Sequence, residues 1–169
     1  TQGSGKSLTM VFLARKIKRT KGLMDSTIVV VTDRIDLDKQ IFGTFNRTLS
    51  KITTPVRADK IEYMKTLLSN PQPQIIMTTI QKFQNETEEK EVLFDGKKTI
   101  QKYAVEYPVL STKQNIIVLT DEAHRSQYKD TASNMRVALP NAVFIGFTGT
   151  PIDKEDKSSK MIKLHQIES

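Results

Sequence analysis

The chain has 169 residues, which suits one domain, and its 26 Lys and Arg residues outnumber its 19 Asp and Glu residues to give a net charge of +7. It has no cysteine, which excludes a disulfide framework and a thiolate metal site and fits a reducing cytoplasm. No apolar run approaches the ~18–20 residues of a membrane span, so no membrane association is expected. The basic balance allows a polyanionic partner but does not require one.

A phosphate-binding loop opens the chain. Residues 1–7 read Thr-Gln-Gly-Ser-Gly-Lys-Ser and match the last seven positions of the pattern G-x-x-x-x-G-K-[ST]. Gly3 and Gly5 allow backbone N–H groups to point at an anion, and Ser4 lies between them. Lys6 supplies a charge for the β- and γ-phosphates, and Ser7 supplies a hydroxyl for Mg²⁺. The pattern therefore predicts that a nucleoside triphosphate and Mg²⁺ bind here.

The next elements alternate between helix and strand. An apolar periodicity predicts a helix over residues 5–20 that ends at Gly22, and a helix N-terminus is a favourable place for phosphate. Further elements are predicted in the order strand 27–32, helix 34–48, helix 60–69, strand 74–78, strand 115–120, helix 131–139 and strand 142–147. Such alternation indicates an α/β fold with a mostly parallel sheet flanked by helices.

Residues 85–113 depart from this pattern because charged side chains crowd them. We interpret them as an insertion that forms a solvated, partly mobile excursion at the surface. Residues 152–169 are polar and lack strong periodicity, so they are predicted to be a linker. A strand normally precedes a phosphate-binding loop, and the chain lacks it, so we expect the chain to be a piece of a larger protein.

The strand predicted at residues 115–120 is short, apolar and rich in β-branched residues, as is typical of a central parallel strand. It leads into Asp121-Glu122-Ala123-His124. Asp121 is placed to ligate hydrated Mg²⁺, and Glu122 to orient or deprotonate an attacking water. Two solvated carboxylates after a strand are common, so this tetrapeptide alone is weak evidence for a nucleotide site. It becomes strong evidence together with the phosphate-binding loop, because the two motifs supply complementary parts of one reaction.

Together these stretches resemble the first RecA-like motor domain of superfamily 2 helicases and translocases, and most of all the motor (R) subunit of type I restriction enzymes. The matching stretches run in the family's order and cover residues 1–10, 29–37, 78–83, 119–128 and 139–151. The most specific are Asp-Glu-Ala-His-Arg-Ser-Gln-Tyr, which begins at Asp121, and Ile-Gly-Phe-Thr-Gly-Thr-Pro, which ends at Pro151.

The resemblance implies a RecA-like P-loop NTPase domain over residues 1–151 that lacks the strand before the loop, and a linker at 152–169 toward a second motor domain. It implies an ATP-dependent translocase on double-stranded DNA, in a complex with specificity and methyltransferase subunits. The nuclease centre of such an enzyme lies in a separate domain. The second RecA-like domain is expected to supply an arginine for catalysis, so the isolated chain is expected to hydrolyse ATP poorly.

The resemblance also implies roles for further residues. His124 joins the nucleotide site. Arg34, Thr78 and Thr79 are placed to contact the DNA backbone, where a guanidinium and hydroxyls can donate to phosphate oxygens. The stretch Thr148-Gly149-Thr150 is expected to couple the nucleotide state to domain movement. Simpler structural roles stay open, with Thr79 as a helix N-cap and residues 148–150 as a strand-ending turn.

Two other functions remain open at this point. One is a helicase that unwinds DNA or RNA, because Asp-Glu-Ala-His is shared with such enzymes. The other is a nucleotide-binding module that does not catalyse, against which the presence of Lys6, Ser7, Asp121 and Glu122 argues.

Overall fold

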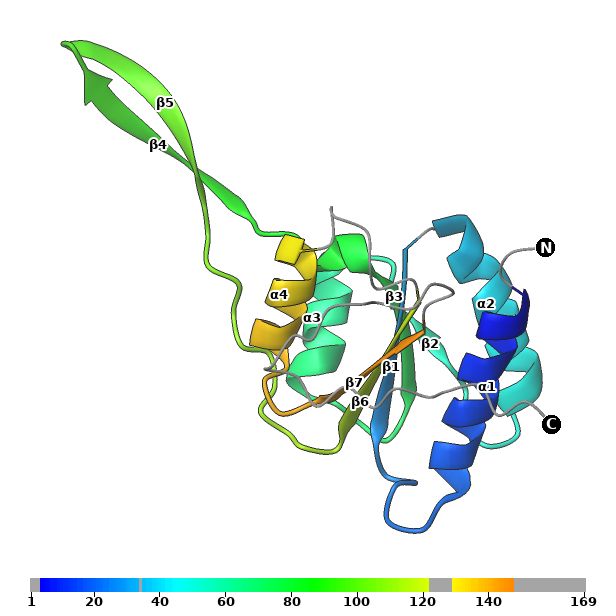
Figure 1. Ribbon diagram of the computed structural model, residues 1–169. Coiled ribbons are helices and arrows are strands. Elements are labelled where there is room, and N and C mark those ends of the chain that lie inside the picture. The colour runs from blue at the N-terminus through cyan, green and yellow to red at the C-terminus, as the bar shows by residue number, and fades with distance from the viewer. Residues whose placement is uncertain (1–3, 34, 122–128, 148–169) are drawn as a thin grey trace, which may run out of the picture.

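The fold is an α/β sandwich built on a five-stranded parallel sheet (Figure 1). It is seen in a computed structural model that describes residues 4–33, 35–121 and 129–147. The helices and strands follow in the order α1 (Ser4–Arg19), β1 (Thr27–Thr32), α2 (Ile35–Leu49), β2 (Val56–Arg57), α3 (Ile61–Ser69), β3 (Ile75–Thr79), the 3₁₀ helix η1 (Ile80–Phe83), β4 (Thr87–Phe94), β5 (Lys97–Ala104), β6 (Ile116–Asp121), α4 (Lys129–Ala138) and β7 (Val143–Phe147).

The main sheet has the strand order β2-β3-β1-β6-β7, and each described pair of neighbours runs parallel. Every residue of β1 and β3 is buried, as expected for strands that helices cover on both faces. The predicted α/β class with a parallel sheet is therefore confirmed. Because the strands are parallel, their carboxyl ends all lie at one edge of the sheet.

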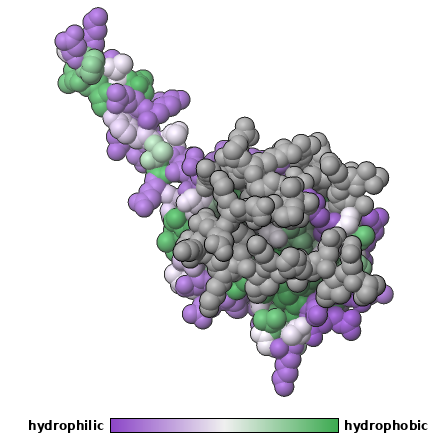
Figure 2. Space-filling view, in the orientation of Figure 1, coloured by the Kyte–Doolittle hydropathy of each residue, from purple (hydrophilic) through white to green (hydrophobic). Residues whose placement is uncertain are grey.

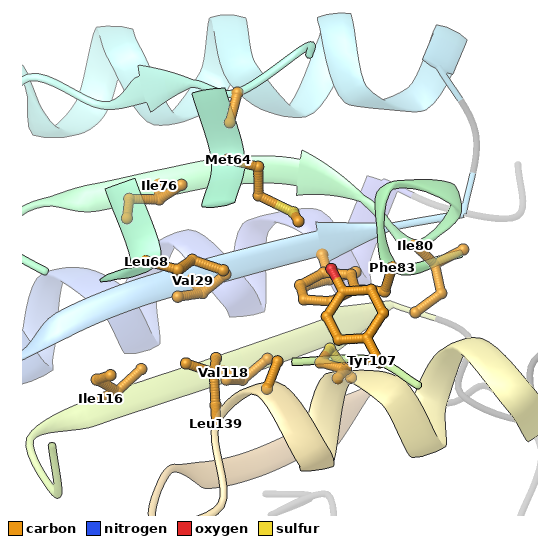
Figure 3. Close-up of a cluster of buried hydrophobic side chains, with 14 residues drawn as sticks. Val29, Met64, Leu68, Ile76, Ile80, Phe83, Tyr107, Ile116, Val118 and Leu139 are labelled. Atoms are coloured by element: carbon orange, nitrogen blue, oxygen red, sulfur yellow. The ribbon is translucent and has the colours of Figure 1, made fainter. Parts of the chain in front are cut away.

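Two apolar layers hold the helices against this sheet, because alternate residues of a strand point to opposite faces. Ile28 and Val30 of β1 join one layer with Met10 of α1 and Phe45 of α2. Val29 of β1 joins the other layer, which α3, η1 and α4 complete (Figure 3). Helices α1 and α2 thus cover one face of the sheet, and α3 and α4 cover the opposite face (Figure 1).

Two residues, Gly22 and Lys18, shape the turn between α1 and β1. Gly22 follows α1 with φ +86°, a backbone conformation that a side chain disfavours, so the predicted stop at this glycine is confirmed. Lys18 folds back from α1, and its ammonium donates to the carbonyl oxygens of Ser26 at 2.6 Å and Met24 at 3.2 Å. Burial lowers the pKa of Lys18, and the nearby carboxylate of Asp25 offsets part of that shift.

Within the stretch predicted as an irregular insertion, the structure contains a regular β-hairpin. Strands β4 and β5 pair antiparallel from Thr87 opposite Ala104 to Phe94 opposite Lys97. The two turn residues, Asp95 and Gly96, have φ values of 48° and 72°, which suit a tight hairpin turn. Asp-Gly was therefore a usable signal in the sequence, but the dense charges around it hid the alternation of a strand. The expected surface position is confirmed, since every residue of β5 is exposed.

The other predicted elements agree with the observed ones to within one or two residues at each end, except for the short β2 and η1, which were not predicted. Residues 152–169 lie outside the described residues, so the linker stays a prediction. None of the helices in the described ranges has the length and apolar character needed to span a bilayer.

Replacing Phe45 with Ala should destabilise the domain strongly. Phe45 is fully buried between α2 and the sheet, and truncating such a side chain typically costs about 3–5 kcal/mol. Phe12→Ala is the matched control, because Phe12 is 59% exposed and its removal should change the free energy of unfolding by less than about 0.5 kcal/mol. Urea denaturation measures both, and equal losses would contradict the described core.

Candidate functional site

The carboxyl edge of the sheet brings the start of α1 next to the end of β6. The Lys6 ammonium lies 3.6 Å from Oδ1 of Asp121. Lys6 belongs to the first turn of the described part of α1, and Asp121 is the last residue of β6. The two motifs that the sequence placed far apart therefore meet in space, as their assignment to one site predicted.

Because the Lys6–Asp121 pair is partly buried, separating its two charges costs free energy unless a ligand compensates both of them. The Asp121 residue is only 8% exposed, whereas the Lys6 side chain is 24% exposed. Removing one partner of a buried ion pair leaves a charge without compensation and is costly. A ligand that separates Lys6 from Asp121 must therefore supply a negative charge for the ammonium and a positive charge for the carboxylate. A triphosphate with its divalent cation supplies both.

The N-terminal turn of α1 is suited to an anion. The helix has no acidic residue in its first described turn, so no side chain of that turn offsets the positive end of the helix dipole. A Cβ added at Gly5 would meet no atom within 4 Å, so packing inside the described domain does not require glycine there.

The chemistry of the available donors fits MgATP. Mg²⁺ prefers oxygen ligands and keeps several waters, so it needs only one or two protein oxygens beside the phosphates. Ser7 and Asp121 offer a hydroxyl and a carboxylate, and Lys6 offers a point charge to the phosphates. The described residues therefore include three of the expected donors, Lys6, Ser7 and Asp121.

Several predicted site residues lie outside the described residues, so their placement stays untested. The backbone of Ser4 is described, at the start of α1, but not its side chain. The chain leaves β6 at Asp121 and β7 at Phe147, and these two residues pair in register, so both strands end side by side. The residues outside the description are Gly3, Arg34, Glu122, His124, Thr148, Gly149 and Thr150.

The structure separates the two threonines that were expected to contact DNA. The Thr78 residue is 1% exposed, and its hydroxyl donates to the carbonyl oxygen of Ala58 at 3.1 Å. Its side chain is thus used inside the domain, tying β3 to the segment after β2. Thr79 is 6% exposed and occupies the N-cap position of η1, where its side chain makes no capping hydrogen bond.

A glutamine that the sequence analysis did not single out joins the loops after β1 and β3. The Gln81 side-chain amide donates to the carbonyl oxygen of Asp33 at 2.7 Å. This contact fixes the start of η1 against the end of β1, where both loops reach the carboxyl edge. One sequence offers no signal for it, because the two residues become neighbours only through the pairing of β1 with β3.

A recess of about 170 Å³ lies at the base of the hairpin. Its lining includes Lys65, Glu86 and Tyr107. Burial raises the pKa of the Tyr107 phenol to about 12, and the nearby Glu86 carboxylate adds to the shift. A phenol with so high a pKa stays neutral at physiological pH. The recess shares no residue with the Lys6–Asp121 pair.

Comparison with known proteins points in one direction. The family model described as SWI2/SNF2 ATPase matches residues 1–168. The HindI type I restriction enzyme endonuclease subunit of Haemophilus influenzae is 43% identical over 95% of the chain, and the MjaIXP endonuclease subunit of Methanocaldococcus jannaschii, named for the same enzyme type, is 39% identical over 95%. A Staphylococcus saprophyticus subunit, SsaAORF53P, is 30% identical over 94%. The chain spans only 14–15% of the length of these relatives. The resemblance to type I restriction enzyme motor subunits is thereby confirmed.

Replacing Thr78 with Val tests its structural role. Loss of the hydroxyl leaves the buried Ala58 carbonyl without this donor, which should cost about 1–3 kcal/mol of unfolding free energy. Thr66→Val is the control, because the Thr66 hydroxyl bonds its own helix at an exposed site and should matter by less than about 0.5 kcal/mol. Denaturant titration measures both. Unchanged stability in Thr78→Val, with weakened DNA binding, would instead favour a contact with DNA.

Proposed function

Because the chain belongs to the SWI2/SNF2 ATPase family, we propose that it is the ATP-hydrolysing motor domain that drives translocation along double-stranded DNA within a type I restriction endonuclease. The observation that carries the proposal is the meeting of Lys6 and Asp121 at the carboxyl edge of a parallel sheet. The relatives are named as endonuclease subunits of that enzyme class, which supports the choice of DNA as the track.

In the proposed mechanism, Lys6 and the backbone N–H groups of Gly3, Ser4 and Gly5, at the start of α1, bind the phosphates. Lys6 exchanges the Asp121 carboxylate for phosphate oxygens, and Asp121 then accepts hydrogen bonds from the water shell of the cation. Ser7 contributes its hydroxyl to the same cation. Bound Mg²⁺ neutralises the charge that develops on the phosphates.

Two residues that follow Asp121 in the sequence, Glu122 and His124, complete the proposed chemistry. Glu122 orients the attacking water and takes its proton, and His124 contacts the nucleotide site. Thr148, Gly149 and Thr150 follow β7, and β7 pairs with β6, so a change at the end of β6 has a short route to them. We assign these three residues to the coupling between nucleotide state and domain movement.

The loops after β1 and β3 are the proposed DNA contacts. Arg34 follows Asp33, and the Gln81 side chain donates a hydrogen bond to the carbonyl oxygen of Asp33. Thr79 is the N-cap of η1, the 3₁₀ helix that contains Gln81. Contacts to phosphate from such loops fix position without reading sequence, which suits a motor that must move along any DNA. Thr78 supports this surface from below through its bond to Ala58.

Other domains and subunits of the proposed enzyme supply the functions that this domain lacks. A second RecA-like domain supplies the arginine that stabilises the transition state, a role worth ~10³–10⁵ in rate in related phosphoryl transfers. Residues 152–169 lead toward that domain. Specificity and methyltransferase subunits choose the DNA site, and a separate domain cuts.

Lys6→Ala and Glu122→Gln should each abolish DNA-stimulated ATP hydrolysis in the full-length protein. The first removes the phosphate-binding charge, so nucleotide binding should fall as well, whereas the second should spare binding and stop turnover. Lys16→Ala is the control, because Lys16 is exposed on the same helix and outside the site. Steady-state phosphate release and equilibrium nucleotide binding are the readouts. Turnover at the normal rate in either site variant would overturn the assignment.

Translocation on duplex DNA predicts that the complete enzyme displaces a third strand from a DNA triplex when ATP is present, without separating the two strands of the duplex. Triplex displacement and strand displacement are therefore measured side by side on labelled DNA. Strand separation at a rate matching ATP turnover would favour the unwinding helicase instead. Absence of both, with ATP hydrolysis intact, would remove the motor function.

A further inference from the structure

The 3₁₀ helix η1 connects the carboxyl edge of the sheet to the hairpin of β4 and β5. It follows directly after Thr79, a proposed DNA contact, and its last residue, Phe83, leads through residues 84–86 into β4. Every residue of β5 is exposed, and the hairpin stands clear of the other described parts of the chain (Figure 2). A movement of this arm therefore acts on the end of η1 unless that end is held.

The end of η1 is held by side chains from outside the helix. Short 3₁₀ helices have poor hydrogen-bond geometry, and the last carbonyls of any helix lack partners within it. The Asn134 amide of α4 donates to the Phe83 carbonyl oxygen at 2.8 Å. The Tyr107 hydroxyl donates to the Lys82 carbonyl oxygen at the longer distance of 3.5 Å. Asn134 therefore makes the shorter of these two contacts.

Asn134 also fixes the base of the hairpin. Its amide bonds the side chain of Asn85, whose own amide donates to the Val105 carbonyl oxygen at 3.0 Å. Asn85 precedes β4 and Val105 follows β5, so the two ends of the hairpin are joined at this point. One side chain of α4 thus connects to the end of η1 and to the base of the arm, and it can resist a displacement of the arm before that displacement reaches η1.

Helix α4 is a firm support because it packs against the main sheet. Met135, the neighbour of Asn134, is 4% exposed and belongs to the same apolar layer as Val118 and Phe83 (Figure 3). Val118 lies in β6, the strand that ends at Asp121. Asn134 therefore connects η1 to the strand that carries the carboxylate of the proposed nucleotide site.

The other end of η1 meets the loop after β1. The Gln81 amide donates to the Asp33 carbonyl oxygen at 2.7 Å, and Ile80 is buried in the layer that contains Phe83. With both ends held, η1 keeps the two proposed DNA-contact loops in one arrangement. Loops that are already arranged contact phosphates without the entropy cost of ordering.

We propose that Asn134 is a positioning residue for DNA, which holds η1 against α4 so that the loops after β1 and β3 keep their grip on the DNA backbone while ATP is hydrolysed. The inference rests on the proposed translocation along duplex DNA. Phe83 and Asn85, the partners of Asn134, are not residues that we assign to nucleotide or DNA. Loss of Asn134 should therefore leave ATP hydrolysis intact and let the DNA slip.

The number of ATP molecules hydrolysed per displaced triplex strand tests this role in the complete enzyme. Asn134→Ala removes both hydrogen bonds, and Asn134→Asp keeps the shape of the side chain without its donor. We expect each to raise the ratio by at least about threefold, within the range by which residues between two sites change their coupling. The thermal midpoint shows that each variant folds. A loss of folded enzyme would lower both rates together, so a purely structural role would not move the ratio.

Asn141→Ala is the matched control. The Asn141 amide also donates to a distant backbone carbonyl, that of Thr112 at 2.7 Å, but this contact does not involve η1 or the hairpin. Its loss removes a hydrogen bond of the same kind and should leave the ratio unchanged. An equal rise in Asn141→Ala would contradict a specific role for Asn134.

Amide hydrogen exchange tests the physical link without DNA. In the full-length chain, peptides that cover residues 79–86 should exchange faster in Asn134→Ala than in the unmodified protein, and at the unmodified rate in Asn141→Ala. Unchanged exchange, or an unchanged ratio in both Asn134 variants, would overturn the positioning role and leave the motor assignment standing. Absence of triplex displacement by the unmodified enzyme would instead overturn the proposed translocation, and this role with it.

Discussion

The parallel pairing of β3, β1 and β6 is the constraint on which the site depends. It sends the carboxyl ends of the three strands to one edge, so Thr79, Thr32 and Asp121 end their strands at neighbouring positions. Backbone hydrogen bonds set that register, and burial of both faces protects it. Residues far apart along the chain are thereby brought to one edge of the sheet.

The apolar layer beneath α1 makes the ion pair possible. Met10 and Ala14 of α1 pack in the same layer as Leu119 of β6, two residues before Asp121. The start of the helix is thereby held over the end of the strand, and Lys6 reaches the carboxylate at 3.6 Å. The geometry of the Lys6–Asp121 pair is thus a consequence of core packing, because the two charged groups could not hold each other in water. A nucleotide then enters a site whose positive helix terminus and carboxylate are already in place.

Neighbouring residues of one strand end can have different tasks, as β3 shows. The hydroxyl of Thr78 points into the domain and bonds Ala58, whereas Thr79 begins η1 at the edge. Gln81 then ties η1 to Asp33, so the two proposed DNA-binding loops form one supported surface. The hairpin that follows η1 projects away from the sheet (Figure 1).

The sequence by itself determined the α/β class and most element boundaries, and it predicted the residues of a nucleotide site. Each of these depends on residues that lie close together in the sequence: the hydrophobic periods of helices and strands, a glycine-rich loop at a helix start, and acidic residues after a buried strand. It could not show that Gln81 meets Asp33, that Thr78 is used internally or that Lys6 lies against Asp121, because those contacts join segments that only the strand order brings together. The tertiary structure also decided the form of residues 85–113. Charge made that stretch resemble a loop, while the Asp95-Gly96 turn and cross-strand ion pairs, which need two paired strands to exist, make it a hairpin.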